Sequence, residues 1–280
     1  MKPFRWDLSR REQLGRLTEG ECYEAYPEFI DDLRACCSRV LAFSEGGMLV
    51  FVGRSPESMF DYFSGVLSGT SHEEQLVLLN ISNRGRPVSE IRKEDPTAYE
   101  GLVDHFQQCG VSPGDILSRK TKTYFTDIVA RGGTFGEIAQ FLHDWAAETS
   151  VPWRDLRKKL GFLGVTLKKK TSPNTWRWYQ QSEWVQDLQV KHTRSVSIGD
   201  KLIYYLADYQ PKTSWSHWPR WWGSEKSQKP PREEHILMAL RTAYSIYLRG
   251  TEEKQLFSEL LSRESAMMDA WFRQVVGELR

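Results

Sequence analysis

The sequence predicts an α/β protein with a parallel β-sheet. Three apolar runs carry this prediction: Met48–Val52, Gln75–Ile81 and Tyr124–Val129. Runs without polar alternation are typical of strands that are buried on both faces. Between and after these runs, the chain shows turn residues and helix-type spacing, and strands that alternate with helices over 45–148 favour right-handed parallel connections. In such sheets ligands bind at the carboxyl ends of the strands.

The composition is that of an ordinary soluble chain, and it limits the classes of function. The chain has 280 residues, enough for one large domain or for a core with an appendage. Its net charge is +1, so no global field recruits nucleic acid or a membrane. No run of about 18 apolar residues occurs, and no secretory signal is apparent. The sequence therefore predicts a cytoplasmic protein without a membrane segment.

Residues 1–44 are predicted to form a polar arm followed by a helix. Apolar residues three and four apart between Phe29 and Leu41 form one helical stripe. Cys36 and Cys37 belong to this region, and adjacent cysteines are a poor disulfide pair. Because no C-x-x-C occurs either, we interpret both as small core residues, with no disulfide framework and no metal site.

The first strand, Met48–Val52, is followed directly by Gly53, Arg54 and Ser55. Ser55 is a suitable N-cap for the next helix, and Pro56 suits its first turn. The guanidinium fork of an arginine can pair with phosphate oxygens. This is a strand–turn–helix geometry for anion binding, and by itself it equally fits a surface arginine in a capping loop.

The segment after the second strand is a polar loop that contains Arg84 and Arg86. A helix over Thr97–Gln108 follows and ends near Gly110, because glycine is favoured just after a helix. The two arginines are candidates for contact with a ligand, and an ordinary exposed loop explains them as well.

The third strand, Tyr124–Val129, carries Asp127 near its end and continues into Gly132, Gly133 and Thr134. A helix pattern begins directly afterwards. The free N–H groups and the dipole of a helix N-terminus favour an anion, and glycines let the backbone approach a phosphate closely. The Thr134 hydroxyl can add a donor. The alternative is an ordinary turn between a strand and a helix.

At these residues the chain resembles the type I phosphoribosyltransferases. In that family a strand ends in two acidic residues that hold the ribose hydroxyls of phosphoribosyl pyrophosphate, and a glycine- and threonine-containing turn binds the 5′-phosphate. The resemblance implies that Asp127 is the catalytic-site acid. It implies 5′-phosphate binding by the turn Ala130, Arg131, Gly132, Gly133 and Thr134.

The same resemblance assigns the upstream loop and the arginine loop. It implies pyrophosphate binding by Gly53, Arg54 and Ser55, and mobile-loop contacts by Arg84 and Arg86. The chain departs from the family pattern at two positions. Thr126 replaces the first acid, and Ala130 stands where some members carry a further Asp.

The implied activity is transfer of ribosyl 5-phosphate from phosphoribosyl pyrophosphate to an unidentified nitrogenous acceptor. Mg²⁺ would bridge the substrate oxygens and would need few protein ligands. The alternative is a non-catalytic protein of the same fold, a sensor or adaptor that binds a nucleotide or a protein partner. Thr126 and Ala130 favour this alternative.

The second half of the chain is predicted to be built differently from the α/β core over 45–150. Eight of the eleven tryptophans fall in 151–231, which we interpret as a Trp-rich cap or subdomain. Basic residues interleaved with aromatics can also bind single-stranded nucleic acid, a reading that the near-neutral charge disfavours. Residues 232–280 show helix spacing and are predicted to form an α-helical appendage that packs on the core or mediates contacts with a partner or a second copy.

Overall fold

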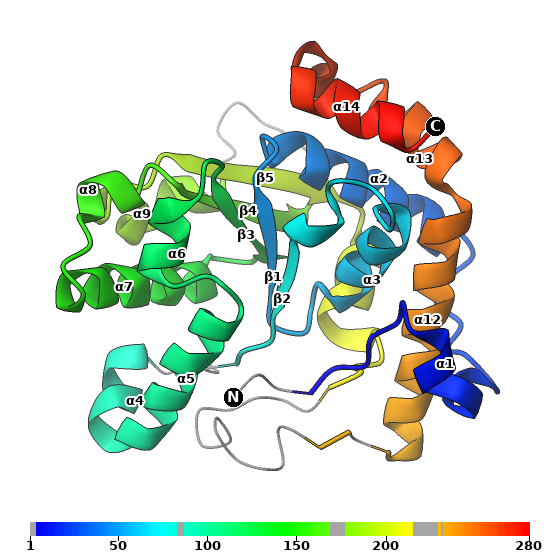
Figure 1. The fold of residues 1–280 in the computed structure, drawn as a ribbon, viewed down its shortest axis with the longest axis horizontal. Helices are drawn as coiled ribbons and strands as arrows, with labels where there is room; N and C mark the ends of the chain where they lie inside the picture. Colours follow the sequence, from blue (N-terminus) through cyan, green and yellow to red (C-terminus); the bar gives the residue numbers. More distant parts are fainter. Residues whose placement is uncertain (1–3, 83–86, 169–176, 215–228, 231) are drawn as a thin grey trace.

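Five parallel strands form one sheet in the computed structural model of the chain (Figure 1). The structure describes residues 4–82, 87–168, 177–214, 229–230 and 232–280. The strand order is β2-β1-β3-β4-β5. The α/β class and the parallel sheet are therefore confirmed. The strands are β1 (Met48–Val52), β2 (Leu76–Leu79), β3 (Thr123–Ile128), β4 (Leu160–Leu167) and β5 (His192–Ile198).

The sheet extends past residue 150, the point at which the sequence analysis ended the α/β core. β4 pairs with β3, and β5 pairs with β4, so two strands come from the segment that was interpreted as a Trp-rich cap. β4 passes beneath Tyr124, where a methyl group at Gly161 would overlap the tyrosine ring. β5 is an edge strand with polar residues along it, which is why it shows no continuous apolar run.

Helices cover both faces of the sheet and make a three-layer arrangement (Figure 1). Adjacent residues of β1 point to opposite faces: Leu49 and Phe51 join one core cluster, while Val50 and Val52 join the other. Helices of the first cluster and the N-terminal turns are α1 (Arg11–Leu14), η1 (Gly15–Thr18), α2 (Phe29–Phe43), α3 (Glu57–Val66), η2 (Glu73–Gln75), α10 (Asp200–Tyr204) and the π-helical turn η4 (Tyr205–Tyr209).

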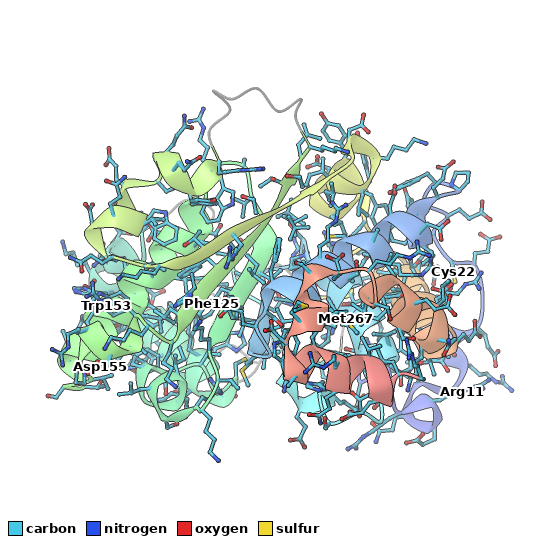
Figure 2. All side chains as sticks on the ribbon, turned by 90° about the horizontal axis from the view of Figure 1, so that it is seen from above. Arg11, Cys22, Phe125, Trp153, Asp155 and Met267 are labelled. Carbon is cyan, nitrogen blue, oxygen red and sulfur yellow. The ribbon has the colours of Figure 1, made fainter. Side chains whose placement is uncertain are left out.

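The opposite face is covered by helices that lie between β2 and β5 in the chain. These are α4 (Val88–Glu94), α5 (Pro96–Gln108), α6 (Pro113–Ser118), α7 (Gly133–Glu148), α8 (Trp153–Leu156), η3 (Trp178–Gln181) and α9 (Glu183–Asp187). Figure 2 shows Trp153 and Asp155 of α8 at one end of the molecule and Arg11 of α1 at the other. No helix in the described ranges has the length and apolarity needed to cross a lipid bilayer. The cytoplasmic location stays a prediction.

The C-terminal helices pack on the first face of the sheet. They are α12 (Glu234–Glu252), α13 (Lys254–Leu261), η6 (Ser265–Met268) and α14 (Ala270–Glu278). α12 crosses α3 at two glycines. A methyl group at Gly65 would overlap the carbonyl oxygen of Tyr247, and one at Gly250 would overlap that of Tyr62. This backbone-to-backbone approach fixes the helical appendage against the helix that follows β1.

The α3–α12 crossing generates a stability prediction. Gly65→Ala should lower the free energy of unfolding by about 1–3 kcal/mol, because the added methyl group cannot fit without separating the two helices. Urea denaturation followed by circular dichroism measures this change. The matched control is Gly277→Ala in α14, where nothing lies within 4 Å of the new methyl group. The control should be neutral or stabilising, by up to about 1 kcal/mol. Equal stability of the two variants would contradict the tight crossing.

Candidate functional site

The two predicted phosphate loops follow neighbouring strands. β1 and β3 are parallel and directly paired, so Val52 and Ile128 end at the same edge of the sheet. The chain runs from β1 outward to β2 on one side, and returns to β3 on the other. Such a topological switch point is where open α/β sheets bind ligands. The structure thus places 53–55 and 130–134 at the same end of the sheet, after neighbouring strands.

The turn after β3 forms an open helix N-terminus. Gly132 has a left-handed conformation, with φ 79°, and its carbonyl accepts the N–H of Gly136 at 3.0 Å. No side chain of the described residues caps α7. The turn lines a cavity of about 460 Å³, together with Asp127 and Glu137. Its first N–H groups and the dipole of this 16-residue helix therefore face a space that suits an anion.

The two glycines of the turn have different functions. A methyl group at Gly133 would meet nothing within 4 Å, so this position is open toward the ligand space. A methyl group at Gly132 would lie 2.6 Å from the Trp178 ring, and one at Gly164 would overlap the indole nitrogen of Trp178. Trp178 thus lies against Gly132 and Gly164, and packs on Phe135 with 5.5 Å between ring centroids. Gly132 serves the backbone turn and the packing of this indole.

Asp127 is the carboxylate at the site. Its Oδ1 accepts the N–H of Ile128 at 2.7 Å, and the side chain lines the same cavity as the phosphate turn. Burial raises the pKa of Asp127 to about 8, while the Ile128 N–H and the charge of Lys212 act in the opposite direction. Thr126 is fully buried in β3, and its hydroxyl has no hydrogen-bond partner among the described residues. A buried threonine hydroxyl carries no negative charge, so Thr126 does not supply the second acid that the resemblance implies beside Asp127.

The loop after β1 is closed by a segment that sequence reasoning missed. The Gln210 amide donates to the carbonyl oxygens of Arg54 and Ser55, at 2.7 Å each. The Gln210 oxygen accepts the backbone N–H of Ser58 at 3.2 Å, so it caps the first turn of α3. The guanidinium of Arg54 donates to the carbonyl of Ser214 at 3.1 Å. At least part of the donor fork that was assigned to pyrophosphate therefore binds the chain itself.

Glu57 holds the end of this segment. It is 2% exposed, and its carboxylate accepts the N–H of Thr213 at 3.1 Å and the hydroxyl groups of Thr213 and Ser214 at 2.9 Å each. Asn80, just after β2, donates to the Ser214 hydroxyl at 2.6 Å. Residues 210–214 are thereby joined to the carboxyl ends of both β1 and β2. Gln-Pro-Lys-Thr-Ser has no periodicity or motif, so nothing in the sequence identified it.

The structure leaves two predicted contacts without a test. Arg84 and Arg86 lie outside the described residues. Ala130 and Arg131 are exposed at the rim of the turn, and they also line a second cavity of about 940 Å³ that extends to β4 and β5. No group of three His, Cys, Asp or Glu side chains suited to a metal ion occurs among the residues that the structure describes.

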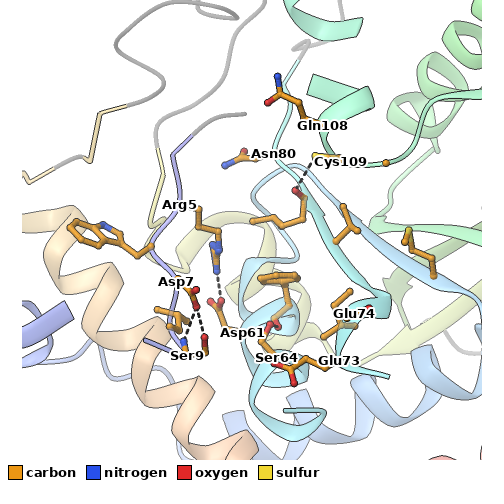
Figure 3. A pocket seen from close by; sticks show the side chains of 18 of the residues that line it. Arg5, Asp7, Ser9, Asp61, Ser64, Glu73, Glu74, Asn80, Gln108 and Cys109 are labelled. Atoms are coloured by element: carbon orange, nitrogen blue, oxygen red, sulfur yellow. Dashed lines mark hydrogen bonds and ion pairs between the residues drawn. The ribbon is translucent and has the colours of Figure 1, made fainter. Parts of the chain in front are cut away.

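A third cavity, of about 860 Å³, lies beside the outer edge of β2 (Figure 3). Figure 3 shows Arg5 bonded to Asp61 there, with Asn80 and Cys109 nearby. None of the described residues that were predicted to form the phosphate site lines this cavity. It is therefore separate from the predicted phosphate site.

Comparison of the chain with protein-family models, with curated proteins and with solved structures finds no match. The functional assignment therefore depends on the residues and geometry of the chain itself. The geometry defines an α/β protein with an open helix N-terminus and a buried carboxyl group at its switch point.

Asp127 generates a prediction on pH dependence. Its folded pKa of about 8 lies above the ordinary 3.8, so the folded state holds a proton that the unfolded state has lost. The contribution of Asp127 to the free energy of unfolding is fully present at acid pH, and it is lost as the pH rises toward about 8. Asp127→Asn removes this loss. Its advantage in Tm over the wild type should be near zero at pH 4 and reach a plateau above pH 8.

Differential scanning calorimetry across this pH range measures the effect. The carboxyl group opens onto the cavity, and solvent weakens the effect, so we expect a plateau of only about 2–4 °C. Parallel Tm curves for wild type and Asp127→Asn would contradict a raised pKa of Asp127.

Proposed function

We propose that the protein binds phosphoribosyl pyrophosphate at the switch point and transfers its ribosyl phosphate to a nitrogenous acceptor. One observation carries this proposal: the two anion-type loops follow directly paired parallel strands. Neighbouring strands lie about 4.8 Å apart. A single sugar that carries phosphate groups at both ends can therefore reach both loops at once.

The proposed roles follow from position. The turn 130–134 binds the 5′-phosphate through the N-terminal N–H groups of α7, and Asp127 holds the ribose hydroxyls. The 53–55 loop lies on the diphosphate side. Mg²⁺ enters bound to the substrate diphosphate and keeps much of its water shell, so it needs no cluster of protein ligands. The protein acts by positioning the substrate and by stabilising charge on the leaving pyrophosphate.

The second cavity supports a position for the acceptor. It shares residues 128–131 with the phosphate turn and extends to the ends of β4 and β5. Its volume, about 940 Å³, is ample for a nucleobase-sized molecule. An acceptor bound here would lie beside the ribosyl group that is held at Asp127.

The burial of Thr126 favours a second candidate function. Asp127 stands without a neighbouring acid, and Ala130 supplies no further carboxylate. Ribose recognition then depends on one carboxyl group, which suits a sensor or adaptor that binds the ligand without turnover. Release of pyrophosphate upon addition of acceptors separates the enzyme from the sensor.

The phosphate turn generates the central prediction. Gly133→Asp should weaken binding of Mg²⁺-phosphoribosyl pyrophosphate by at least about tenfold, because a carboxylate at the first helical position repels the 5′-phosphate. The fold should tolerate this change. The new side chain has open space, and an acid in the first turn of α7 is favourable to the helix. Isothermal titration calorimetry measures the affinity, with Asp127→Ala as a second variant expected to abolish binding.

The matched control is Gly114→Asp. It makes the same charge change in the first turn of α6. This helix precedes β3, so the new charge lies at the amino-terminal end of the strands, away from the phosphate turn. The affinity of this control should equal that of the wild type. The proposal fails if folded wild-type protein shows no binding. It also fails if Gly133→Asp and Gly114→Asp bind equally well.

A further inference from the structure

Lys212 is a partly buried cation at the switch point, and its partners are neutral. Its ammonium group donates to the carbonyl oxygen of Leu206 at 3.1 Å and to that of Arg54 at 3.2 Å. No ion pair formed among the described residues includes Lys212. Burial lowers the pKa of Lys212 to about 8. A charge withdrawn from water is costly unless an opposite charge compensates it, so an anionic ligand at this position would stabilise the ammonium.

The charged groups around Lys212 do not form a close ion pair with it. The groups that influence Lys212 are Glu57 of α3, Arg54 of the first loop, Asp127 of β3 and Asp208 of η4. The Glu57 oxygens already accept hydrogen bonds from Thr213 and Ser214. The raised pKa of Asp127 keeps that carboxyl group largely protonated at neutral pH. Glu57, Asp127 and Asp208 therefore act on the ammonium from beyond ion-pair distance, and none of the three pairs with it directly.

The ammonium is held in place from both sides. On one side, Gln210 is bonded to Arg54, Ser55 and Ser58. On the other side, Thr213 and Ser214 are bonded to Glu57. An ammonium group has three N–H donors, and the two carbonyl oxygens use two of them. Among the described residues no partner takes the third donor, and both Arg54 and Asp127 lie close enough to influence the ammonium electrostatically.

We propose that Lys212 binds a diphosphate oxygen of the ligand, and that residues 210–214 form the third wall of the site beside the two predicted loops. The ligand class is an organic diphosphate, and the assignment to phosphoribosyl pyrophosphate rests on the function proposed above. Arg54 then acts as a positioning residue, since its guanidinium binds the Ser214 carbonyl.

The test compares Lys212→Met with Lys201→Met. Lys201 lies nearby in α10, is 61% exposed, and pairs with Glu28, so its loss is a matched control for charge. Calorimetric titrations use three probes: Mg²⁺-phosphoribosyl pyrophosphate, Mg²⁺-pyrophosphate and ribose 5-phosphate. Lys212→Met should lower the affinity for both diphosphate ligands by roughly tenfold to a hundredfold, which is the effect of one charge-assisted hydrogen bond. Ribose 5-phosphate should bind as in the wild type, because it contacts the turn 130–134. Lys201→Met should change none of the three.

Two further measurements distinguish ligand binding by Lys212 from a purely structural function. They are the rescue of affinity by arginine and the pH dependence of affinity. Lys212→Arg should recover most of the diphosphate affinity. Wild-type affinity should fall between pH 7 and pH 9 as Lys212 deprotonates, and the always-charged arginine should flatten this fall. Ionisation of Asp127 acts equally in both proteins, so the difference between the two profiles reports on Lys212.

The outcomes are distinct. Unchanged diphosphate affinity in Lys212→Met, with a lowered Tm, would show a structural tether and overturn the inference while leaving the proposed function intact. Equal losses for ribose 5-phosphate and for the diphosphates would also overturn it, since they would indicate general damage to the site. Absence of binding of all three probes to folded wild type would overturn both the inference and the proposed function.

Discussion

The pairing of β1 with β3 is the constraint on which the site depends. The carboxyl ends of parallel strands lie at one end of the sheet. The connections that follow β1 and β3 leave the sheet in opposite directions, which parts the two loops. The helices after the two strands, α3 and α7, pack on opposite faces of the sheet. Their N-termini therefore lie at the same end of the sheet, one on each face. A swap of β1 with any outer strand would separate these two helix ends and remove the site.

The two helix ends are nevertheless unlike. Gln210 caps the first turn of α3, whereas α7 begins at Gly132 with no side-chain cap in the described chain. The α3 end is thus satisfied internally, and the α7 end remains available for a phosphate. In the proposed function, this asymmetry favours the monophosphate at α7 and leaves the diphosphate side to cations such as Lys212. It also explains why the first loop needs a third wall: its carbonyl oxygens face Gln210 and Lys212.

The elements that depend on a local residue pattern could be predicted from the sequence. Apolar runs identified β1, β2 and β3, and the glycine turn identified the start of α7. β5 was not identified because an edge strand need not be apolar, and its polar residues hide the strand pattern. Residues 210–214 were not identified because their function arises from contacts across about 150 residues of chain, such as that between Glu57 and Thr213. No local propensity encodes such a contact. The second function of Gly132, packing against Trp178, was hidden for the same reason.

The protonation of Asp127 links the site to its ligand. Under the proposed function, a protonated Asp127 and the ammonium of Lys212 would both favour the entry of a phosphorylated ligand. In the proposed complex, Mg²⁺ carried by the ligand would favour the ionised carboxylate, and the phosphates would favour the charged Lys212. Ligand binding and proton exchange are then coupled. In the proposed function one acid stands in place of two, so Asp127 alone would recognise the ribose and respond to the metal. A sensor requires only such a coupled change of state, whereas an enzyme must in addition hold the ribosyl group in line with its acceptor.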